Sequence, residues 1–237
     1  MHEIISPNHY NTDIFIVTKK TSPSNIRNLQ KLDLPIRIEN SKPISLARKL
    51  CLLKTTKDFV LFIDDDVFVS DIVFEQLSKQ MKSDVGAVEG IPLVRGFGKW
   101  FDNSINKYHV RCELKKGERG FTIITLVRKS LALDWAPPLL TSYEDYALSQ
   151  HILSKGFKWI KIPVSAIHLK SWKKITQNLL WAGNGWKQFF KQKLNDRIKV
   201  SIEYSISPFT MFIRDKDPFL FLYRIYFNWL FAFIILL

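Results

Sequence analysis

Three consecutive carboxylates follow an apolar run in the first third of the amino-acid sequence. Residues 59–63 read Phe-Val-Leu-Phe-Ile, and Asp64, Asp65 and Asp66 come directly after them. An apolar run of this length predicts a buried strand, and ligands of open α/β sheets bind at the carboxyl ends of such strands. Adjacent acids repel one another, so we expect a positive partner, and a divalent cation that bridges a diphosphate is the simplest one. The alternative, an acidic helix N-terminus, suits Asp71 better than these three residues.

A second acidic pair, Glu144 and Asp145, stands where a helix is expected to begin. Residues 141–146 read Thr-Ser-Tyr-Glu-Asp-Tyr, and the helical pattern continues to Lys155. Ser142 with Asp145 three residues later resembles a capping box, so a purely structural role for the acids stays open. A carboxylate at the mouth of a sheet could equally act as a general base toward a sugar hydroxyl.

Three further residues are candidates for a site at the same edge of the sheet. His168 follows a predicted strand at 159–164 and could bind a metal ion, although a lone histidine is more often simply packed. Glu39 ends an earlier predicted strand, where an acid can contact a ribose or a base edge or can be an ordinary turn residue. Arg48 could neutralise phosphates, although solvation at the surface is the default for such a side chain.

Several common enzyme signatures are missing from the sequence. There is no P-loop, no G-x-G-x-x-G motif after a strand and no G-x-S-x-G motif, so the usual kinase, dehydrogenase and hydrolase mechanisms lack their signatures. The two cysteines, Cys51 and Cys112, predict neither a disulfide framework nor a zinc site. The first residues lack a charged region followed by an apolar core, so we expect no signal peptide.

The chain is strongly basic and carries an apolar segment at its carboxyl end. The formal net charge is +13 over 237 residues. Residues 155–199 combine many lysines with tryptophan and phenylalanine, and Asp196 is their only acid. Residues 218–237 are mostly apolar, with Arg224 as their only charge, and about 20 apolar residues suffice to span a bilayer.

Two kinds of anionic partner fit such a basic aromatic segment, an anionic lipid surface and single-stranded nucleic acid. The apolar segment that follows favours the membrane, so no nucleic-acid partner is expected. The positive-inside rule then places the folded part at the cytoplasmic face of the cell membrane. The alternative for residues 218–237 is a hydrophobic helix buried in the core or in an oligomer.

Periodicity along the chain predicts the elements that would position these residues. Strands are expected at 13–18, 34–39, 59–63, 85–89, 121–127 and 159–164, and helices at 44–53, 70–82, 101–112 and 142–155. Strands that alternate with helices predict an α/β sandwich, with a mostly parallel central sheet flanked by helices. Residues 90–120 contain several glycines and little periodicity, so they are expected to form long loops around one helix.

Taken in order, these segments resemble the family 2 glycosyltransferases, whose catalytic domain has the GT-A fold. The resemblance rests on KDFVLFIDDD at 57–66, which matches the family's D-x-D motif, and on TSYEDYALSQHILSKGFKW at 141–159, which contains its E-D pair. The segments DIFIVT, RIEN, SLARKLCL and AIHLKSW add to it. Together they cover about residues 12 to 175.

The resemblance implies a role for each acid of the two motifs. Asp66 would hold a Mg²⁺ or Mn²⁺ ion that bridges the donor diphosphate, and Asp64 or Asp65 would contact the ribose or the metal. Asp145 matches the acid that inverting members use as catalytic base, and Glu144 stands beside it.

The resemblance also implies roles for the other three candidates. Glu39 stands where the family usually has an aspartate that contacts the nucleotide base, and Arg48 matches an arginine near the nucleotide. His168 matches a histidine that some members use as a further metal ligand. The ends of the first two strands depart from the family's usual turns, so the donor base cannot be named. A Q-x-x-R-W motif is absent, which predicts a single transfer rather than polymer synthesis.

These features predict an inverting, metal-dependent transfer of a sugar from a nucleotide-diphospho-sugar to an acceptor at the cytoplasmic membrane face. A lipid-linked acceptor, either a polyprenyl phosphate or a lipid-linked glycan, is expected because of the basic and apolar carboxyl-terminal part. We expect a GT-A domain at 1–175, a basic aromatic interfacial segment at 176–216 and a hydrophobic membrane-associated helix at 217–237.

Two other functions remain open from the sequence. A sugar-nucleotide nucleotidyltransferase would also use a metal and a doubly wound sheet, but it needs a glycine-rich loop after the first strand, and residues 19–23 contain no glycine. A non-enzymatic basic module that binds a membrane or nucleic acid would leave the three adjacent aspartates unexplained.

Overall fold

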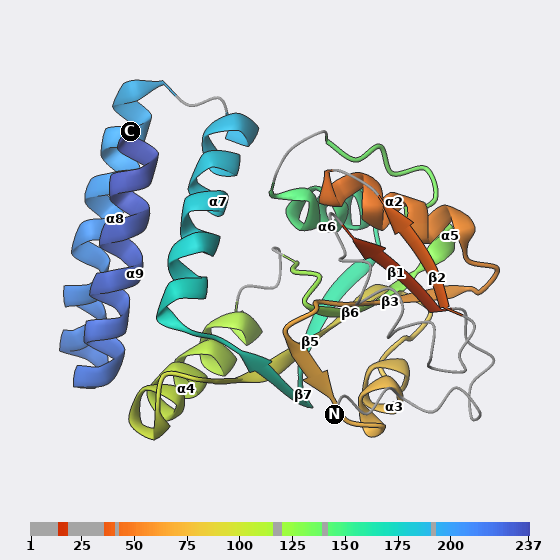
Figure 1. Ribbon diagram of the computed structural model, residues 1–237, viewed down its shortest axis with the longest axis horizontal. Helices are drawn as coiled ribbons and strands as arrows, with labels where there is room; N and C mark the ends of the chain where they lie inside the picture. Colours follow the sequence, from red (N-terminus) through yellow and green to blue (C-terminus); the bar gives the residue numbers. More distant parts are fainter. Residues whose placement is uncertain (1–13, 19–35, 41–42, 116–119, 139–141, 191–192) are drawn as a thin grey trace.

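A computed structural model describes residues 14–18, 36–40, 43–115, 120–138, 142–190 and 193–237 (Figure 1). The strands are β1 (Ile14–Thr18), β2 (Ile36–Asn40), β3 (Phe59–Ile63), β4 (Val67–Val69), β5 (Val85–Arg95), β6 (Ile124–Arg128) and β7 (Lys158–Leu169). The helices are α2 (Ile44–Lys54), α3 (Ile72–Ser78), α4 (Lys99–Lys115), α5 (Lys129–Ala132), α6 (Glu144–Ser154), α7 (Trp172–Phe190), α8 (Leu194–Asp215) and α9 (Pro218–Leu236).

The central sheet has five strands in the order β3-β6-β5-β7-β4, and it is mixed. Only β5 and β7 are parallel neighbours; the pairs β3–β6, β6–β5 and β7–β4 are antiparallel. β1 and β2 form a separate parallel pair. The prediction of a mostly parallel sheet is therefore wrong. An apolar run indicates that a strand is buried on both faces, but it does not show whether the strand is parallel or antiparallel to its neighbours.

Helices cover both faces of this sheet, because alternate strand residues point to opposite sides. On one face, Ala87 and Val127 pack with Leu52 of α2 and Leu148 of α6. On the other face, the neighbouring strand residues pack against α3; this second cluster contains Val73, Leu77, Val85, Val88, Ile124, Leu126, Val164 and Ala166. Figure 1 shows α2 and α6 above the sheet and α3 below it.

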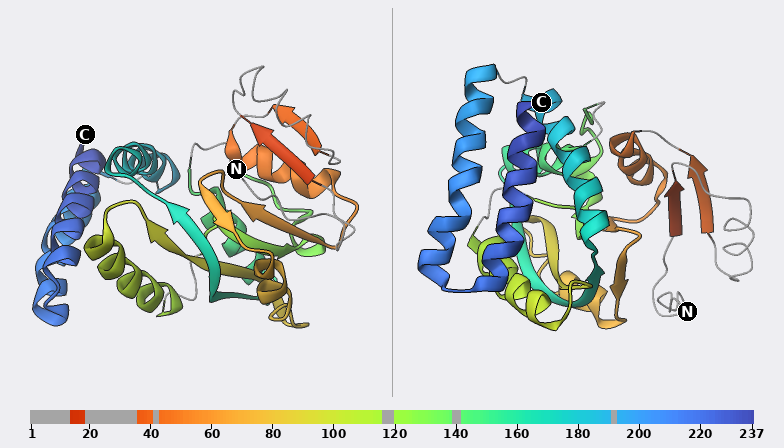
Figure 2. Two further views of the ribbon diagram at one scale, coloured as in Figure 1. Left: turned by 60° about the horizontal axis from the view of Figure 1, so that its bottom comes forward. Right: turned by 60° about the vertical axis from the view of Figure 1, so that its left-hand side comes forward.

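Strands β5 and β7 run further than the sequence predicts and extend beyond β3 and β6 (Figure 2), and the last part of β7 pairs with β4. They remain paired as far as Arg95 and Leu169, with a register shift between Ile91 and Leu93, where Pro92 has no N–H to donate to the ladder. The expected loop at 90–95 is thus a strand, and His168, which was expected after a strand, lies within β7.

Helices α4, α7, α8 and α9 pack at the far end of these two strands. Figures 1 and 2 show α7, α8 and α9 side by side, with α7 nearest to the sheet. Their shared core contains Val94, Ile105, Tyr108, Ile175, Leu179, Leu220, Tyr223, Phe231, Ile234 and Ile235. Helix α9 therefore contributes to the core of the described structure.

A tight turn folds α9 back along α8. Helix α8 ends at Asp215, and Lys216 directly after it has a left-handed backbone with φ of 50°. The side chain of Asp217 then accepts a hydrogen bond from the backbone N–H of Leu220 at 2.9 Å, and Pro218 occupies the first turn of α9, where its missing N–H costs nothing. By length and composition alone, α9 is the one helix in the described part of the chain that could cross a membrane.

Candidate active site

Backbone hydrogen bonds hold the three aspartates between β6 and β7. The N–H of Asp64 donates to the carbonyl of Ile123 at 2.9 Å, directly before β6. The carbonyl of Asp66 accepts from the N–H of Leu169 at 2.9 Å, at the end of β7. The segment that follows β3 is thus fixed at both ends, and its carboxylates meet residues from β7, α2 and the start of α7.

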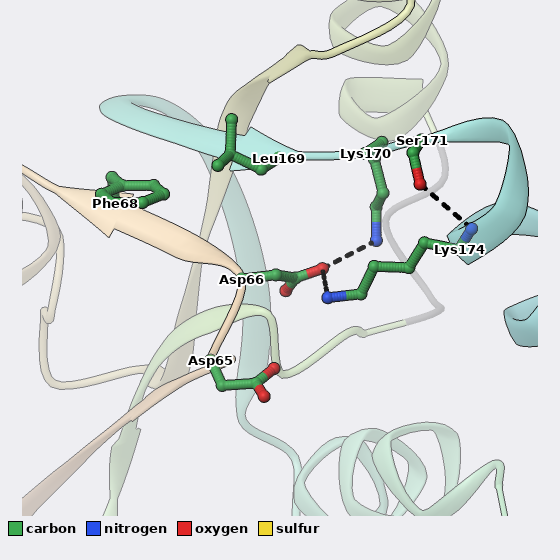
Figure 3. A pocket seen from close by; sticks show the side chains of 7 residues that line it. All are labelled: Asp65, Asp66, Phe68, Leu169, Lys170, Ser171 and Lys174. Atoms are coloured by element: carbon green, nitrogen blue, oxygen red, sulfur yellow. Dashed lines mark hydrogen bonds and ion pairs between the residues drawn. The ribbon is translucent and has the colours of Figure 1, made fainter. Parts of the chain in front are cut away.

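Asp66 lies at the centre of a compact charged cluster (Figure 3). Its Oδ2 atom is 2.8 Å from Nζ of Lys174 and 3.5 Å from Nζ of Lys170, as Figure 3 shows. The same atom is 2.9 Å from Nε2 of His168, which the figure does not draw. Burial alone would raise the pKa of Asp66, but the hydrogen bonds from His168 and Lys174 outweigh it and hold the pKa below its usual range. Burial lowers the pKa of His168 despite the neighbouring carboxylate. Asp66 is therefore ionised and His168 neutral near pH 7.

Arg48 of α2 joins the two acidic motifs. Its Nη2 atom is 3.6 Å from Oδ1 of Asp64, and its Nη1 atom donates to Oε1 of Glu144. The side chains of Arg48 and Glu144 are 11% and 3% exposed, whereas that of Asp64 is 36% exposed. A buried guanidinium and a buried carboxylate must neutralise each other, so this pair ties α2 to the start of α6.

The backbone before the Glu144–Asp145 pair has an uncommon conformation. Tyr143 has φ of 71°, which is rare for a residue with a bulky side chain. Its ring packs against Phe189 and Phe190 of α7, with centroids 5.8 and 5.6 Å away. Such conformations persist only where the surrounding structure imposes them, and they are frequent at functional sites.

The capping-box interpretation of this segment is wrong. Tyr143, not Ser142, precedes the first helical residue of α6, and no side chain caps the helix. The Ser142 hydroxyl is buried without a hydrogen-bond partner among the described residues. The Oδ1 atom of Asp145 accepts a hydrogen bond from the N–H of Tyr146 at 2.7 Å. The capping box is thereby excluded, while both acids do lie in the first turn of α6, where they suit the helix dipole.

A buried network that sequence reasoning missed supports the segment before β6. Oε2 of Glu89 accepts hydrogen bonds from the N–H of Phe121 at 2.8 Å and from Nε1 of Trp159 at 2.9 Å. Nζ of Lys161 lies 3.7 Å from Oε1 of the same glutamate, and both side chains are buried. The network fixes the chain two residues before Ile123, the acceptor of the Asp64 N–H. Glu89 looks like an ordinary strand end in the sequence, so no local signal marks it.

The structure brings together most, but not all, of the residues proposed from the sequence. Asp64, Arg48 and Glu144 form one chain of contacts, and Asp66 and His168 form another. Glu39 is placed in β2, but its side chain lies outside the described residues.

A cavity of about 390 Å³ opens beside the Asp66 cluster. Its lining consists of Asp65, Asp66, Phe68, Leu169, Lys170, Ser171 and Lys174. Sequence reasoning missed the two lysines as site residues, because it assigned them to a membrane-binding segment. The signal that could have found Lys170 is its spacing from His168, since residues two apart share one side of a strand.

The described residues fit a divalent cation only in part. No group of three or more His, Cys, Asp or Glu side chains in the described ranges could hold a metal ion by itself. Asp66 and His168 alone offer an ionised oxygen and a neutral ring nitrogen, which are suitable ligands for Mn²⁺ or Mg²⁺ together with diphosphate oxygens. Asp64 is turned toward Arg48 instead.

Comparisons with known proteins identify the fold. No family model matches the chain, and no curated protein matches it. The mannosyltransferase PcManGT from Pyrobaculum calidifontis, in complex with GDP-Man and Mn²⁺, superposes with a TM-score of 0.56 at 13% identity. TarS 1–349 from S. aureus superposes with a TM-score of 0.50 at 11% identity, covering 94% of this chain and 80% of that one. This chain has a glycosyltransferase fold.

The glycosyltransferase fold confirms the fold type expected from the sequence, while membership of family 2 stays a prediction. The superposition with the mannosyltransferase covers 76% of this chain and 55% of the length of that enzyme. At these identities the likeness concerns the fold, so the roles of individual residues rest on the geometry of the site described above.

The contact between α7 and the segment before α6 leads to a first prediction. A Cβ atom on Gly185 would lie 1.5 Å from Oγ and 2.8 Å from Cβ of Ser142. Gly185→Ala should therefore push α7 away from Ser142 and Tyr143 and lower the free energy of unfolding by about 1–3 kcal/mol. Urea denaturation measures the change. Asn184→Ala, at an exposed position on the same helix, is the control and should change it little; equal effects of the two changes would contradict the close approach.

The environment of Asp64 leads to a prediction about pH. Burial raises the pKa of Asp64 to about 6, with Arg48 acting against the rise. The folded state then binds more protons than the unfolded state between about pH 4 and 6, so this group lowers stability as the pH rises through that window. The Asp64→Asn variant should lack this dependence, which amounts to about 1 kcal/mol or less because the side chain is partly exposed. Denaturant midpoints in EDTA at several pH values measure it, and parallel curves for both proteins would contradict it.

Proposed function

We propose that this chain is a metal-dependent, inverting glycosyltransferase that uses a nucleotide-diphospho-sugar as donor. The observation that carries the proposal is the cluster at Asp66, where an ionised carboxylate contacts a buried histidine and two lysines at the edge of a cavity. Carboxylate and imidazole ligands bind a divalent cation, and ammonium groups bind phosphate oxygens. A diphosphate with its metal ion would use both kinds of group, and the glycosyltransferase fold supports this assignment.

The carboxylate, the imidazole and Lys174 of the cluster have separate roles in this proposal. Asp66 and His168 would hold Mg²⁺ or Mn²⁺, with Asp64 or Asp65 as a further contact to the metal or the ribose. The bound metal would neutralise charge that develops on the departing nucleoside diphosphate. Lys174 lies 2.8 Å from Asp66 in the structure, and it would bind phosphate oxygens when the donor is present. PcManGT was solved with GDP-Man and Mn²⁺, which supports a donor and a metal of this kind.

The second acidic motif would act on the acceptor. Asp145 is half-buried in the first turn of α6 and would take a proton from an acceptor hydroxyl as the oxygen attacks the anomeric carbon. Glu144, next to it, is held by Arg48 and keeps α6 in place beside Asp64. The geometry thus favours Asp145 as base and Glu144 as a positioning residue.

A lipid-linked acceptor at the cytoplasmic face of the membrane is the finer part of the proposal. The support is the net charge of +13 and the apolar surface of α8 and α9. A polyprenyl phosphate is already ionised near neutral pH, so Asp145 would matter less for it than for the hydroxyl of a lipid-linked glycan.

The proposal is tested by incubating the purified protein with Mn²⁺, UDP-, GDP-, CDP- or dTDP-sugars and either a short polyprenyl phosphate or a lipid-linked glycan with a free hydroxyl. We expect release of nucleoside diphosphate from one donor, only with metal and acceptor, and a glycosylated product of inverted anomeric configuration. Asp145→Asn should lower kcat toward a hydroxyl acceptor while donor affinity is kept. Exchange of pyrophosphate with the donor would instead indicate a nucleotidyltransferase, and a product of retained configuration would contradict the mechanism.

A further inference from the structure

Helix α8 presents three different sides along its length. One side packs on α9 and includes Ser201, whose Oγ donates to the carbonyl of Ala232 at 3.0 Å. A second side is polar and carries Asp196, Lys199, Glu203, Thr210 and Arg214. The third side is apolar and exposed to solvent, and it consists of Leu194, Ile198, Ile202, Ile206, Phe209 and Ile213. A soluble helix needs one apolar side to join a core, so the exposed one is unexplained by the fold.

The exposed side of α9 continues this apolar surface. Leu222, Trp229 and Phe233 are between 48% and 60% exposed, and their spacing places them on one side of the helix. Nε1 of Trp229 donates to the carbonyl of Ser205 at 3.1 Å, and its ring lies 6.4 Å from that of Phe209. The apolar sides of the two helices therefore adjoin, and we call the combined surface the α8–α9 face. Contiguous apolar surfaces of this kind mark interaction sites.

The opposite side of α9 packs into the protein core. Leu220, Phe231 and Ile235 are at most 5% exposed within the cluster that α4 and α7 share. The buried side chain of Asn228 donates to the carbonyl of Tyr204 at 3.1 Å. A spanning α9 would have to leave these contacts and expose the core residues of α4 and α7 to water, so the folded arrangement is incompatible with a transmembrane α9.

Charge at the border of the α8–α9 face selects a lipid surface over a second copy of the chain. Lys193, Arg197 and Lys199 lie near the start of α8, where Asp196 is the only acid of the described residues 193–199. Near its end, Arg214 pairs with Asp215 at 2.8 Å and Lys216 stands next to Asp217, so the basic charge lies at the start of the helix. Parallel pairing of two copies would bring the two basic starts of α8 together, and antiparallel pairing would leave both of them without an acidic partner. A bilayer that contains anionic lipids instead attracts basic residues at the border of an apolar surface.

We propose that the α8–α9 face lies flat in the interface of an anionic bilayer, with both helices parallel to the membrane plane and α9 not spanning it. The side chains of Ile202, Ile206 and Phe233 enter the acyl boundary to a depth of about 5–10 Å. The polar side of α8 stays in water. The inference concerns the bilayer contact named in the proposed function, but it is independent of donor, metal and sugar transfer.

Flotation with vesicles of phosphatidylcholine and phosphatidylglycerol tests the face without any nucleotide. The Ile202→Gln/Ile206→Gln variant should lose at least about tenfold in apparent binding, because two half-exposed apolar side chains no longer enter the bilayer. The control variant, Leu53→Gln/Ile72→Gln, changes side chains that are 57% and 50% exposed on α2 and α3 and should bind like the parent. Equal binding by both variants would overturn the assignment of the face. A dimer in light scattering that the first variant abolishes, without vesicle binding by the parent, would assign the face to a second copy.

Nitroxide depth measurements test the orientation and do not depend on the variants above. Single cysteines replace Leu222, Trp229 or Phe233 in a background that lacks Cys51 and Cys112, and each is spin-labelled and bound to vesicles. Orientation in the membrane plane predicts similar shallow depths at all three sites. A deep maximum near the centre of α9, with the two ends at opposite surfaces, would show that the helix spans the bilayer and overturn the proposal. Vesicle flotation and nitroxide depth do not require glycosyltransferase activity. The membrane orientation can therefore be supported or contradicted independently of the proposed function.

Discussion

Replacing Asp66 by Asn is expected to abolish metal-dependent binding of the donor nucleotide and to lower kcat by roughly a thousandfold or more. The amide keeps the shape of the side chain but loses the negative charge that faces His168, Lys170 and Lys174. Without that charge a divalent cation would meet two ammonium groups and one neutral imidazole, which together repel it. Titration calorimetry with Mn²⁺ and nucleoside diphosphate measures the binding, and circular dichroism establishes that the variant is folded.

Asp71→Asn is the matched control for this change. Asp71 is exposed and directly precedes α3, and its side chain makes no capping hydrogen bond there. It should therefore keep both nucleotide binding and turnover. Metal-dependent binding that survives in the Asp66→Asn variant would refute the role given to Asp66, whatever happens to activity.

Replacing Arg48 by Met should destabilise the protein by about 3–5 kcal/mol, because the buried carboxylate of Glu144 is left without its cation. The same change removes the positive charge 3.6 Å from Asp64, so activity should fall as well. Urea denaturation measures the loss of stability. Among the described residues, Lys49 on the same helix makes a hydrogen bond to the carbonyl of Leu133 and no ion pair, so Lys49→Met should cost far less.

A double variant separates charge burial from packing. Arg48→Met/Glu144→Met replaces the pair by apolar side chains of similar length, and it should recover much of the stability that Arg48→Met alone loses. Activity should not recover, since α6 would no longer be oriented by the ion pair. Additive losses of stability in the double variant would mean that the two residues do not neutralise each other.

Local patterns in the sequence were sufficient to predict most of the elements. The apolar run at 59–63 is β3, and the helical pattern at 44–53 is α2 extended by one residue. Burial of one side of each element produces these patterns, so they can be recognised without a structure. Gly156 directly follows the helix expected at 142–155, and it has the positive φ, 81°, that is common just after a helix end.

Long-range pairing was not predictable in the same way. The direction of β6 and the extension of β5 to Arg95 depend on neighbours far along the chain. Gly90 looked like the start of a loop, yet it lies inside β5, where a Cβ would come within 2.8 Å of Val164 on β7. In the sequence alone, a glycine that permits close packing of two strands cannot be distinguished from a glycine that permits a turn.

In the site, too, the sequence revealed the acids themselves but not the contacts that they make with distant residues. The acids were found because three of them follow an apolar strand. The contact between Asp66 and Lys174 joins residues more than a hundred positions apart, and in the sequence Lys174 is one lysine among many. The pairing of Arg48 with Glu144 likewise depends on how α2 and α6 pack on one face of the sheet.

The most direct test of the central claim is the thermal stability of the purified protein with Mn²⁺ and each of UDP, GDP, CDP and dTDP. The account predicts a rise in Tm with one nucleotide that requires the metal and is absent in the Asp66→Asn variant, because ligand binding to the folded state alone stabilises it. The nucleotide that gives the rise identifies the donor base. No metal-dependent rise with any of the four would contradict a nucleotide-diphosphate site at Asp66 and, with it, the proposed glycosyltransferase activity.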